Sequence, residues 1–458
     1  MTESSEKQLP ERLSSPCAIS EASGKVEIWS GDAKLKRGSK TVLGEAVLCL
    51  RFIPKPFINI EFTSRTAPEE NDLLSRLNDY ESLGEYELEC GNPLGTLSVN
   101  IFSLKNGRLY SGAVNSYSPL IKSDLSLSSL KYLVINGPNL FGKVLKGSGT
   151  VFEGRTEAEI AGTKIIVDQI INKDRVVEKS YVFSHLIEVQ LEEGSTNTNI
   201  EKLGQSIHRT LSFMSGRWVG LVGPWGYSKS SELRYIQPKL ELTGLNGSEL
   251  SWYYEMMHGS FSNLFPCVHN ALSEPQLSDV LNSVISWYIE SEQVAGMIEG
   301  SIILQQSALE TLSWYEVVER RQLCSVQGFK KLPTSDKIRL LLSLYSIPSA
   351  IPSKCEDIMA YAKEYNLVDL LEVLADVRNA LVHGAPNRVG GLLTRKLFKR
   401  DNGFQERCEL WYQVSGILAQ SILAVINYQG DIRCRVSDNV FIHSTVKNVP
   451  WKKGDILS

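Results

Sequence analysis

The sequence predicts an α+β multidomain protein, in which a β-rich N-terminal domain of antiparallel sandwich or barrel type precedes an all-α helical bundle. In the first two hundred residues, β-branched and aromatic runs are bounded by Gly, Pro or Asn, as short strands are. No helical crossovers separate these runs, which favours an antiparallel arrangement over a doubly wound sheet. After about residue 273, apolar residues recur at helical spacing instead. We therefore divide the chain into a β-rich domain at 1–195, a bridging segment at 196–272 and a helical domain at 273–458.

The strands predicted for the N-terminal domain are short and rich in apolar residues. Residues 97–101 alternate apolar and polar side chains, as a half-buried strand does. Further strands are expected at 46–53, 57–62, 164–171 and 182–191. Acidic residues crowd the stretch 69–89, where only Arg76 opposes them, and this indicates a solvated acidic face or loop.

The bridging segment is predicted to begin with a helix and to continue as a Trp- and Gly-rich hairpin. Thr198 and Glu201 have the spacing of a capping box, and apolar residues then recur at helical spacing as far as Met214. The hairpin-like stretch covers 216–242. Within it, residues 223–230 approach the pattern of a phosphate-binding loop, but Ser228 stands where that loop needs glycine. A β-turn is therefore the better interpretation.

Five or six helices are predicted for the C-terminal domain. Ser273 and Gln276 give a capping signal, and Pro275 suits a first helical turn. The expected helices cover 276–290, 293–322, 335–346, 356–365, 367–383 and 405–428, and strand-like residues return only at 431–446. This pattern indicates a helical bundle.

Composition and charge limit the kind of protein that this chain can be. A hydrophobic content of 42% with 22% charged residues is typical of a globular protein. The net charge of −4 gives no global attraction to nucleic acid, so any RNA-binding surface must be a local patch. The apolar stretch 414–428 is interrupted by polar residues, so it predicts a core helix and no membrane span.

The cysteines indicate a reducing environment. The eight cysteines are scattered, without a CxxC pair or a His/Cys cluster at zinc-ligand spacing. The first fifteen residues are polar and charged, unlike a secretory leader. We therefore expect a cytoplasmic protein with free thiols, no metal and no other cofactor.

The segment 366–384 carries the chemistry. Its leucines and valines form one stripe of a helix, with Asn366 as the expected N-cap and Gly384 just past the C-terminal end. At about 100° per residue, Arg378 lies roughly 40° from Leu374 and so falls inside the apolar stripe. A guanidinium cannot lose its proton, so this placement is costly unless an anion or a carboxylate meets it.

Asn379 and His383 are four residues apart and share the opposite side of the same helix. Near neutral pH a histidine both accepts and donates protons, and an arginine can hold a phosphate and stabilise charge developing on phosphorus. These groups suffice for RNA cleavage in which the 2′-hydroxyl attacks the adjacent phosphate. No metal is needed, because the RNA supplies its own nucleophile.

The residues Arg378, Asn379 and His383 match the RNxxxH pattern of HEPN ribonucleases. The predicted helix over 298–313 and the stretch 211–219 also resemble those of Apea-like HEPN proteins. The resemblance implies an all-α HEPN domain that pairs into a homodimer, so that two motifs line one cleft. It further implies an endoribonuclease that cuts tRNA or mRNA in anti-phage defence or as a toxin and leaves 2′,3′-cyclic phosphate ends. A phage-derived trigger or an antitoxin would be its regulatory partner.

The same resemblance assigns roles to the three residues. His383 would act as general base or acid at the 2′-oxygen or the leaving 5′-oxygen, Arg378 would bind the scissile phosphate, and Asn379 would orient the histidine or the substrate. A basic run without acidic interruption follows, and it is either a solvated face or a track for the RNA backbone: Arg388, Arg395, Lys396, Lys399 and Arg400. Glu310 is a candidate to pair with Arg378 in the resting state.

Two other interpretations stay open at this point. The helical domain could be a catalytically inactive HEPN dimerisation or RNA-binding module, serving as adaptor or antitoxin. In the other interpretation, Arg378 pairs with a helix of its own bundle, Asn379 caps locally and His383 only ends the helix. The β-rich domain shows no chemistry of its own, so a sensor or substrate-recognition role is the hypothesis for it, with a carbohydrate-binding sandwich as the lesser alternative.

Overall fold

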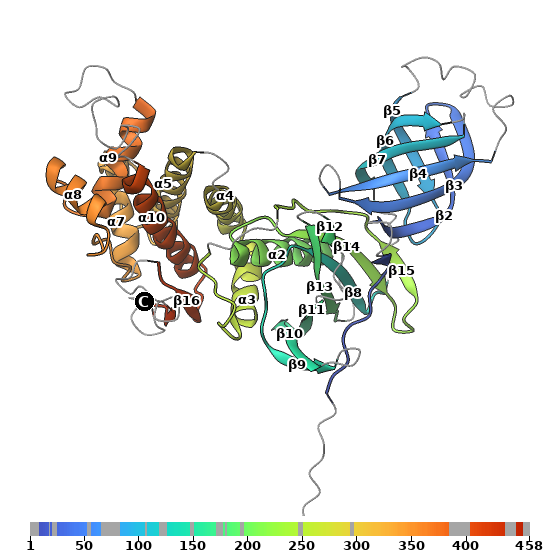
Figure 1. Ribbon diagram of the computed structural model, residues 1–458, viewed down its shortest axis with the longest axis horizontal. Coiled ribbons are helices and arrows are strands. Elements are labelled where there is room, and N and C mark those ends of the chain that lie inside the picture. Colours follow the sequence, from blue (N-terminus) through green and yellow to red (C-terminus); the bar gives the residue numbers. More distant parts are fainter. Residues whose placement is uncertain are drawn as a thin grey trace, which may run out of the picture. The chain divides into compact units, whose positions relative to one another are not determined.

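The β-rich and helical halves predicted from the sequence are both present in the structure, a computed structural model (Figure 1). It describes residues 9–17, 19–20, 25–52, 56–65, 83–105, 108–118, 126–146, 151–170, 177–178, 181–192, 197–245, 251–293, 297–383, 404–435 and 446–451. The chain divides into two compact units. The β unit comprises Met1–Gly204 and Val219–Gly247, and the helical unit comprises Gln205–Trp218 and Ser248–Ser458. The predicted bridging segment is therefore shared between the two units.

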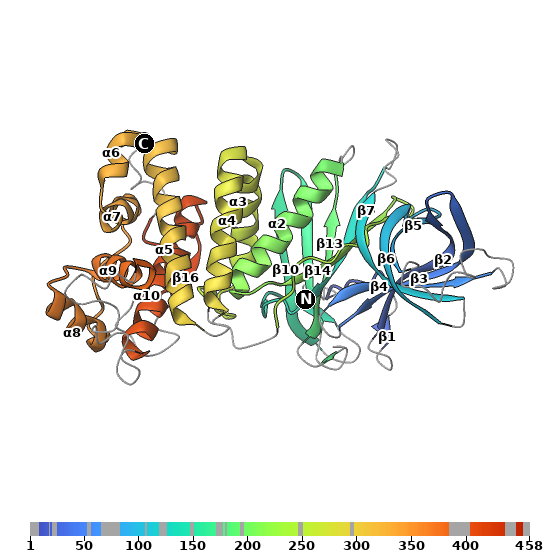
Figure 2. The same ribbon diagram turned by 90° about the horizontal axis from the view of Figure 1, so that it is seen from above.

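The first seven strands of the β unit form a sheet in the order β1-β2-β3-β4-β7-β6-β5. All neighbouring strands are antiparallel, and an additional pairing of β2 with β5 closes six of them into a barrel (Figure 2). The strands are β1 (Ile19–Ser20), β2 (Lys25–Arg37), β3 (Lys40–Arg51), β4 (Phe57–Ser64), β5 (Gly84–Cys90), β6 (Thr96–Lys105) and β7 (Leu109–Ser118). Of the two arrangements predicted for this domain, the barrel is confirmed for these residues.

A second antiparallel sheet has the order β15-β14-β8-β13-β11-β10-β9, with β12 paired to β13 off this path. Its strands are β8 (Ser129–Ile135), β9 (Lys143–Lys146), β10 (Val151–Ile160), β11 (Thr163–Gln169), β12 (Val177–Glu178), β13 (Tyr181–Gln190), β14 (Gly220–Tyr227) and β15 (Leu233–Ile236). One apolar cluster contains residues of both sheets, among them Leu48 and Phe62 from the barrel and Phe183 and Trp225 from the second sheet. The two sheets therefore share a core.

The predicted hairpin at 216–242 is confirmed by β14 and β15, which pair antiparallel. The turn between them is closed by hydrogen bonds from Ser228 N to Glu232 O at 2.9 Å and from Ser231 N to Ser228 O at 2.9 Å. The P-loop-like stretch is thus a strand and a turn, as its serine in place of glycine predicted.

A buried ion pair fastens the N-terminal segment to the second sheet. Arg155 on β10 donates through Nε and Nη2 to the two carboxylate oxygens of Asp168 on β11, each at 2.7 Å. The same carboxylate accepts the backbone N–H of Leu13 at 2.7 Å, and Arg155 Nη2 also donates to Glu11 O at 2.9 Å. Asp168 is fully buried, so its charge depends on these partners.

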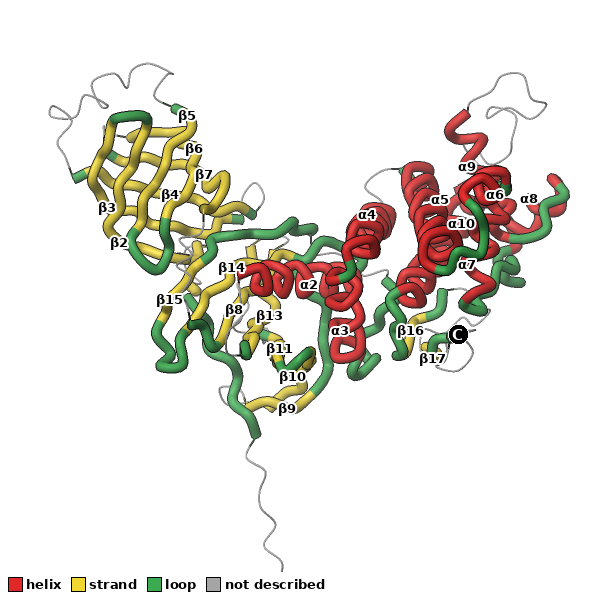
Figure 3. The backbone as a smooth tube through the Cα atoms, turned by 180° about the vertical axis from the view of Figure 1, so that it is seen from behind, coloured by secondary structure: helices red, strands yellow, loops and turns green. Residues whose placement is uncertain are grey.

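The helical unit receives the second part of α2 (Asn197–Ser215) and all later helices (Figure 3, red). These are α3 (Ser260–Ser273), α4 (Pro275–Glu292), α5 (Ile298–Trp314), the π-helix η4 (Tyr315–Arg320), α6 (Val326–Lys331), α7 (Thr334–Leu344), α8 (Glu356–Tyr365), α9 (Leu370–His383) and α10 (Phe404–Val425). A short ladder of β16 (Asp431–Arg433) and β17 (Val446–Asn448) follows. Among the described residues, no helix combines the length and apolar character that crossing a bilayer requires.

The structure corrects three details of the helical prediction. α3 and α6 were not predicted, and the helix expected over 293–322 changes from α to π geometry after Trp314. The capping role expected for Ser273 is wrong, because its Oγ donates to His269 O at the end of α3. Glu274 is the N-cap of α4, and Pro275 occupies the first turn as predicted.

Two residues that follow the last helix are anchored in the core of the helical unit. Arg435 donates to both carboxylate oxygens of Glu292 at the end of α4, at 3.1 and 2.8 Å, and both side chains are only 2% exposed. The buried Trp451 donates through its indole N–H to Tyr428 O at 2.8 Å. Arg435 and Trp451, both beyond α10, are therefore part of this core.

Replacing Asp168 with asparagine is expected to lower the free energy of unfolding of the β unit by about 3–5 kcal/mol, because Arg155 loses its counter-charge inside the sheet. Glu159→Gln, at an exposed position of β10, is the matched control and should change this energy by less than about 0.5 kcal/mol. Urea denaturation followed by circular dichroism measures both. An Asp168→Asn protein as stable as the parent would contradict the role given to this pair.

Candidate functional site

The helix that carries the RNxxxH pattern, α9 (Leu370–His383), starts at an aspartate. Asp369 Oδ1 accepts the backbone N–H groups of Leu371 and Glu372, both at 3.1 Å, which is the geometry of an N-cap. The expectation that Asn366 caps this helix is wrong. Asn366 instead ends α8 in the left-handed conformation, with φ of 54°, which asparagine adopts more readily than most residues.

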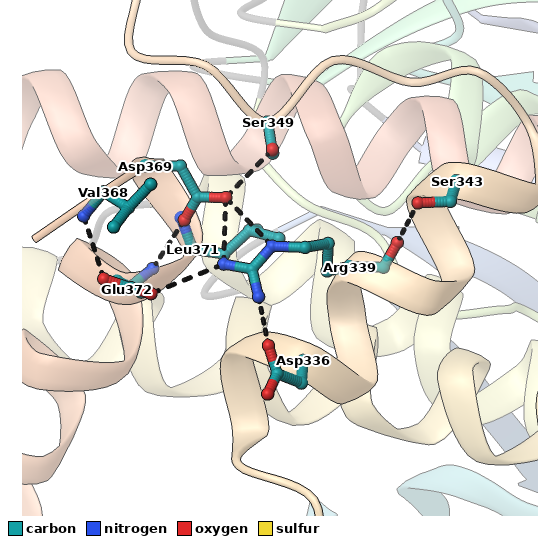
Figure 4. A network of polar contacts seen from close by, with 8 residues as sticks. All are labelled: Asp336, Arg339, Ser343, Ser349, Val368, Asp369, Leu371 and Glu372. Carbon is teal, nitrogen blue, oxygen red and sulfur yellow. Dashed lines mark hydrogen bonds and ion pairs between the residues drawn. The ribbon is translucent and has the colours of Figure 1, made fainter.

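The second oxygen of Asp369 ties α9 to its neighbours (Figure 4). Oδ2 accepts hydrogen bonds from Arg339 Nη2 on α7 at 3.0 Å and from Ser349 Oγ at 3.0 Å. Glu372 accepts the N–H of Val368 at 2.8 Å and lies 3.7 Å from the same arginine. Burial alone would lower the pKa of Arg339, but the hydrogen bond and charge of Asp369 raise it, so the arginine stays protonated.

α9 packs against α5, α7, α8 and α10, and it has one apolar face. Leu371, Leu374 and Val377 on this face are fully buried, as the periodicity predicted. On another side, Asp376 accepts a hydrogen bond from Tyr361 OH of α8 at 2.6 Å. The helix is thus fixed at its start by Asp369 and along its length by neighbouring helices.

Arg378 lies at the margin of the buried face. The residue is half-buried, and its Nε is enclosed without a hydrogen-bond partner among the described residues. Nη1 donates to Oδ1 of the exposed Asn379 at 3.3 Å, beyond the usual range for N–H···O bonds. An enclosed N–H of a permanent cation without an acceptor is destabilising, so this arginine has unused capacity for an anion.

The pairing predicted between Glu310 and Arg378 is wrong. Glu310 on α5 accepts a hydrogen bond from Gln306 Nε2 at 2.9 Å, and no ion pair joins the described side chains of Glu310 and Arg378. Glu310 therefore does not neutralise Arg378.

In the structure, Arg378 and Asn379 are in contact, and His383 lies on the same helix. α9 remains helical through His383, so position 383 follows Asn379 by one helical turn. The side chain of His383 lies outside the described residues. So do the predicted RNA-binding residues Arg388, Arg395, Lys396, Lys399 and Arg400.

Near the end of α9, the guanidinium of Arg378 lies beside the carboxamide of Asn379, and its Nε has no hydrogen-bond acceptor among the described residues. A guanidinium in this state suits a phosphate or carboxylate group of a ligand. Within the part of the chain that the structure describes, no group of three His, Cys, Asp or Glu side chains is placed to hold a metal ion. Sequence reasoning missed Asp369 as the anchor of this helix, although an Asp followed three residues later by Glu is a capping signal.

Fold and site together define a protein with a closed β-barrel, a second antiparallel sheet and a helical unit that presents a cationic group at the end of one helix. The family is given by comparison with known proteins. Residues 122–237 match the YopA central domain and residues 274–446 match the YopA C-terminal domain, so the chain belongs to the YopA family.

A relative in Bacillus subtilis (strain 168) is the SPbeta prophage-derived uncharacterized protein YopA. The two sequences are 26% identical over 350 residues, which cover 74% of this chain and 75% of the relative. No solved structure matches the chain. The YopA C-terminal match contains all of α9, whereas the central match covers most of the second sheet.

Asp369→Ala should lower the free energy of unfolding of the helical unit by about 2–4 kcal/mol, because α9 loses its cap and Arg339 loses its most buried partner. Asp369→Asn should cost less, since asparagine also caps helices. Thermal and urea denaturation measure the differences. Asp336→Asn is the control, because Asp336 pairs with the same arginine at an exposed position and contributes at most about 1 kcal/mol. Equal effects of Asp369→Ala and Asp336→Asn would refute the anchoring role.

Proposed function

We propose that this YopA-family protein is a metal-independent endoribonuclease of the HEPN type, with its active site at Arg378, Asn379 and His383. The observation that carries the proposal is the half-buried guanidinium of Arg378, whose enclosed Nε has no acceptor among the described residues. Two buried arginines elsewhere in this chain, Arg155 and Arg435, are each paired with a carboxylate. A cation without a carboxylate partner among the described residues is available for the phosphate of a ligand.

The proposed reaction uses groups of one helix and the RNA itself. His383 accepts the proton of the 2′-hydroxyl, and the 2′-oxygen attacks the adjacent phosphorus. The bond from phosphorus to the 5′-oxygen breaks, and the leaving oxygen takes up a proton. Arg378 stabilises the charge on the phosphate oxygens, and Asn379 orients the histidine or the substrate. The products are a 2′,3′-cyclic phosphate and a 5′-hydroxyl.

The proposal includes the setting in which the enzyme works. Two chains pair through their helical units so that two motifs line one cleft, and the basic residues at 388–400 follow the RNA backbone. The substrate is tRNA or mRNA in the cytoplasm. Because the related Bacillus protein is prophage-derived, conflict between phage and host, as defence or toxin, is the favoured role. The β unit then restrains the nuclease until a phage-derived trigger acts or an antitoxin is lost.

A second candidate function is a catalytically inactive module that dimerises or binds RNA as an adaptor or antitoxin. The contact between Arg378 Nη1 and Asn379 Oδ1 favours it, because it occupies both polar groups with each other. Both candidates use Arg378 for RNA, but only the first requires His383 for cleavage.

For the nuclease, His383→Ala should slow RNA cleavage by about 10²–10⁴-fold, because the proton transfers lose their carrier. Arg378→Lys should slow it by about 10²–10³-fold, because an ammonium cannot replace the planar guanidinium at a phosphate. The measurement is cleavage of total RNA by purified protein with a chelator present, with the new ends mapped and tested for cyclic phosphate.

His258→Ala is the matched control, since His258 is exposed on a different segment of the helical unit. It should cleave RNA like the parent. Cleavage by His383→Ala at the parental rate would rule out the assigned active site. Binding of RNA without any cleavage by the parent, but lost in Arg378→Ala, would establish the adaptor instead.

A further inference from the structure

A hollow on the surface of the helical unit lies beside the π-helix and plays no part in the proposed ribonuclease site. It encloses about 660 Å³ and is open to solvent. It is lined by residues of α4, of the α5–η4 junction and of the segment leading into α6: Gln276, Trp314, Val318, Glu319, Gln322, Cys324, Ser325 and Val326. Glu319 is the one charged residue in this lining.

The π-helix places an indole next to a carboxylate. In an α-helix, residues five apart point in different directions, whereas hydrogen bonds of a π-helix join residues five apart and stack them on one side. The bond from Arg321 N to Glu316 O, at 3.1 Å, has this spacing. Trp314 and Glu319 have it too, and Trp314 Nε1 donates to Glu319 Oε1 at 2.7 Å. The indole therefore holds this exposed carboxylate beside its own ring.

The wide turn is held from inside by a second carboxylate. Glu316 is completely buried and accepts hydrogen bonds from Arg320 Nη1 at 2.7 Å and from Arg321 Nε at 2.9 Å. Arg320 also donates to Val425 O of α10 at 3.2 Å. Both arginines that follow Glu319 in the chain are thus engaged with Glu316. π-Helical turns of this kind are frequent at functional sites.

We propose that this hollow binds an organic cation, an ammonium or guanidinium group, against the ring of Trp314 and beside the carboxylate of Glu319. An aromatic ring attracts a cation through its quadrupole, tryptophan most strongly, and a carboxylate adds a direct charge partner. Glu319 has an oxygen that the indole does not use. The amide groups of Gln276 and Gln322 and the hydroxyl of Ser325 supply further polar partners. The cation can belong to a free small molecule or to a basic side chain of a peptide.

Cys324 gives a local readout of occupancy, because its thiol lines the same hollow. The probes are N-acetyl-arginine amide, which carries a guanidinium, and N-acetyl-citrulline amide, its neutral isostere. Alkylation of Cys324 by iodoacetamide is followed by mass spectrometry of its peptide at mildly alkaline pH. Burial raises the pKa of Cys17 and of Cys267 to about 11, so these thiols are slow internal references in the same digest.

The arginine derivative should slow alkylation of Cys324 in a saturable way, and the citrulline derivative should not. Glu319→Gln should weaken the protection about 3- to 30-fold, and Trp314→Phe should weaken it less, because an aromatic ring remains. Glu364→Gln, an exposed glutamate of α8 outside the hollow, should leave it unchanged. An arginine-containing peptide compared with the free amide tells which source of the cation binds better.

Three results would overturn the proposal: no saturable protection, equal protection by the citrulline derivative, or full protection in Glu319→Gln. Because Glu319 is exposed, its replacement by glutamine should leave the circular dichroism spectrum and the melting temperature unchanged, and this is checked first. None of these outcomes depends on cleavage of RNA.

Discussion

The carboxylate of Asp369 is the constraint on which the proposed site depends. One carboxylate oxygen accepts the N–H groups of the first turn of α9, and the other accepts hydrogen bonds from Arg339 and Ser349. These bonds fix the first turn relative to its neighbours. Arg378 lies nine residues further, about 14 Å along the axis at 1.5 Å per residue. Because a packed helix is rigid, fixing the first turn of α9 also fixes its last turn. The position of the backbone at Arg378 is thereby set.

Three buried carboxylates of this protein are paired with arginines. Asp168, Glu292 and Glu316 are each surrounded by arginine donors at ordinary hydrogen-bond distances. Such pairs give little net stability over apolar residues, but removing one member is very unfavourable. Each of these buried carboxylates therefore has a positively charged hydrogen-bond donor. The enclosed Nε of Arg378, which has no acceptor among the described residues, is the feature on which the proposed phosphate binding rests.

Much of the fold could be predicted from periodicity, because burial of one face imposes a period on either a strand or a helix. The helix 356–365 was predicted to the residue and the strand at 57–62 nearly so, whereas β3 begins at Lys40, before the predicted start at 46. Closure of the barrel could not be, because the pairing of Ala33 with Cys90 joins residues far apart in sequence. The π-helix was also missed, since it depends on the burial of Glu316, which no local pattern reveals.

At the site, the half-buried position of Arg378 followed from the apolar stripe alone. The cap was assigned to Asn366 because asparagine and aspartate are both good capping residues, although only Asp369 is followed three residues later by a glutamate. Their roles were decided by Arg339 and Ser349, which come from elsewhere in the fold. The predicted pairing of Glu310 with Arg378 was wrong for a similar reason. Glu310 is instead hydrogen-bonded to Gln306 on its own helix.

The anchoring of Arg435 and Trp451 has a consequence for the order in which the helical unit can be completed during synthesis. Both residues follow the last helix, yet Arg435 neutralises Glu292 and Trp451 fills part of the core. Until Arg435 and Trp451 have been translated, Glu292 lacks its arginine partner and the core of the helical unit is incomplete. This core therefore reaches its mature packing only after Trp451 has left the ribosome, well after α9 has been synthesised.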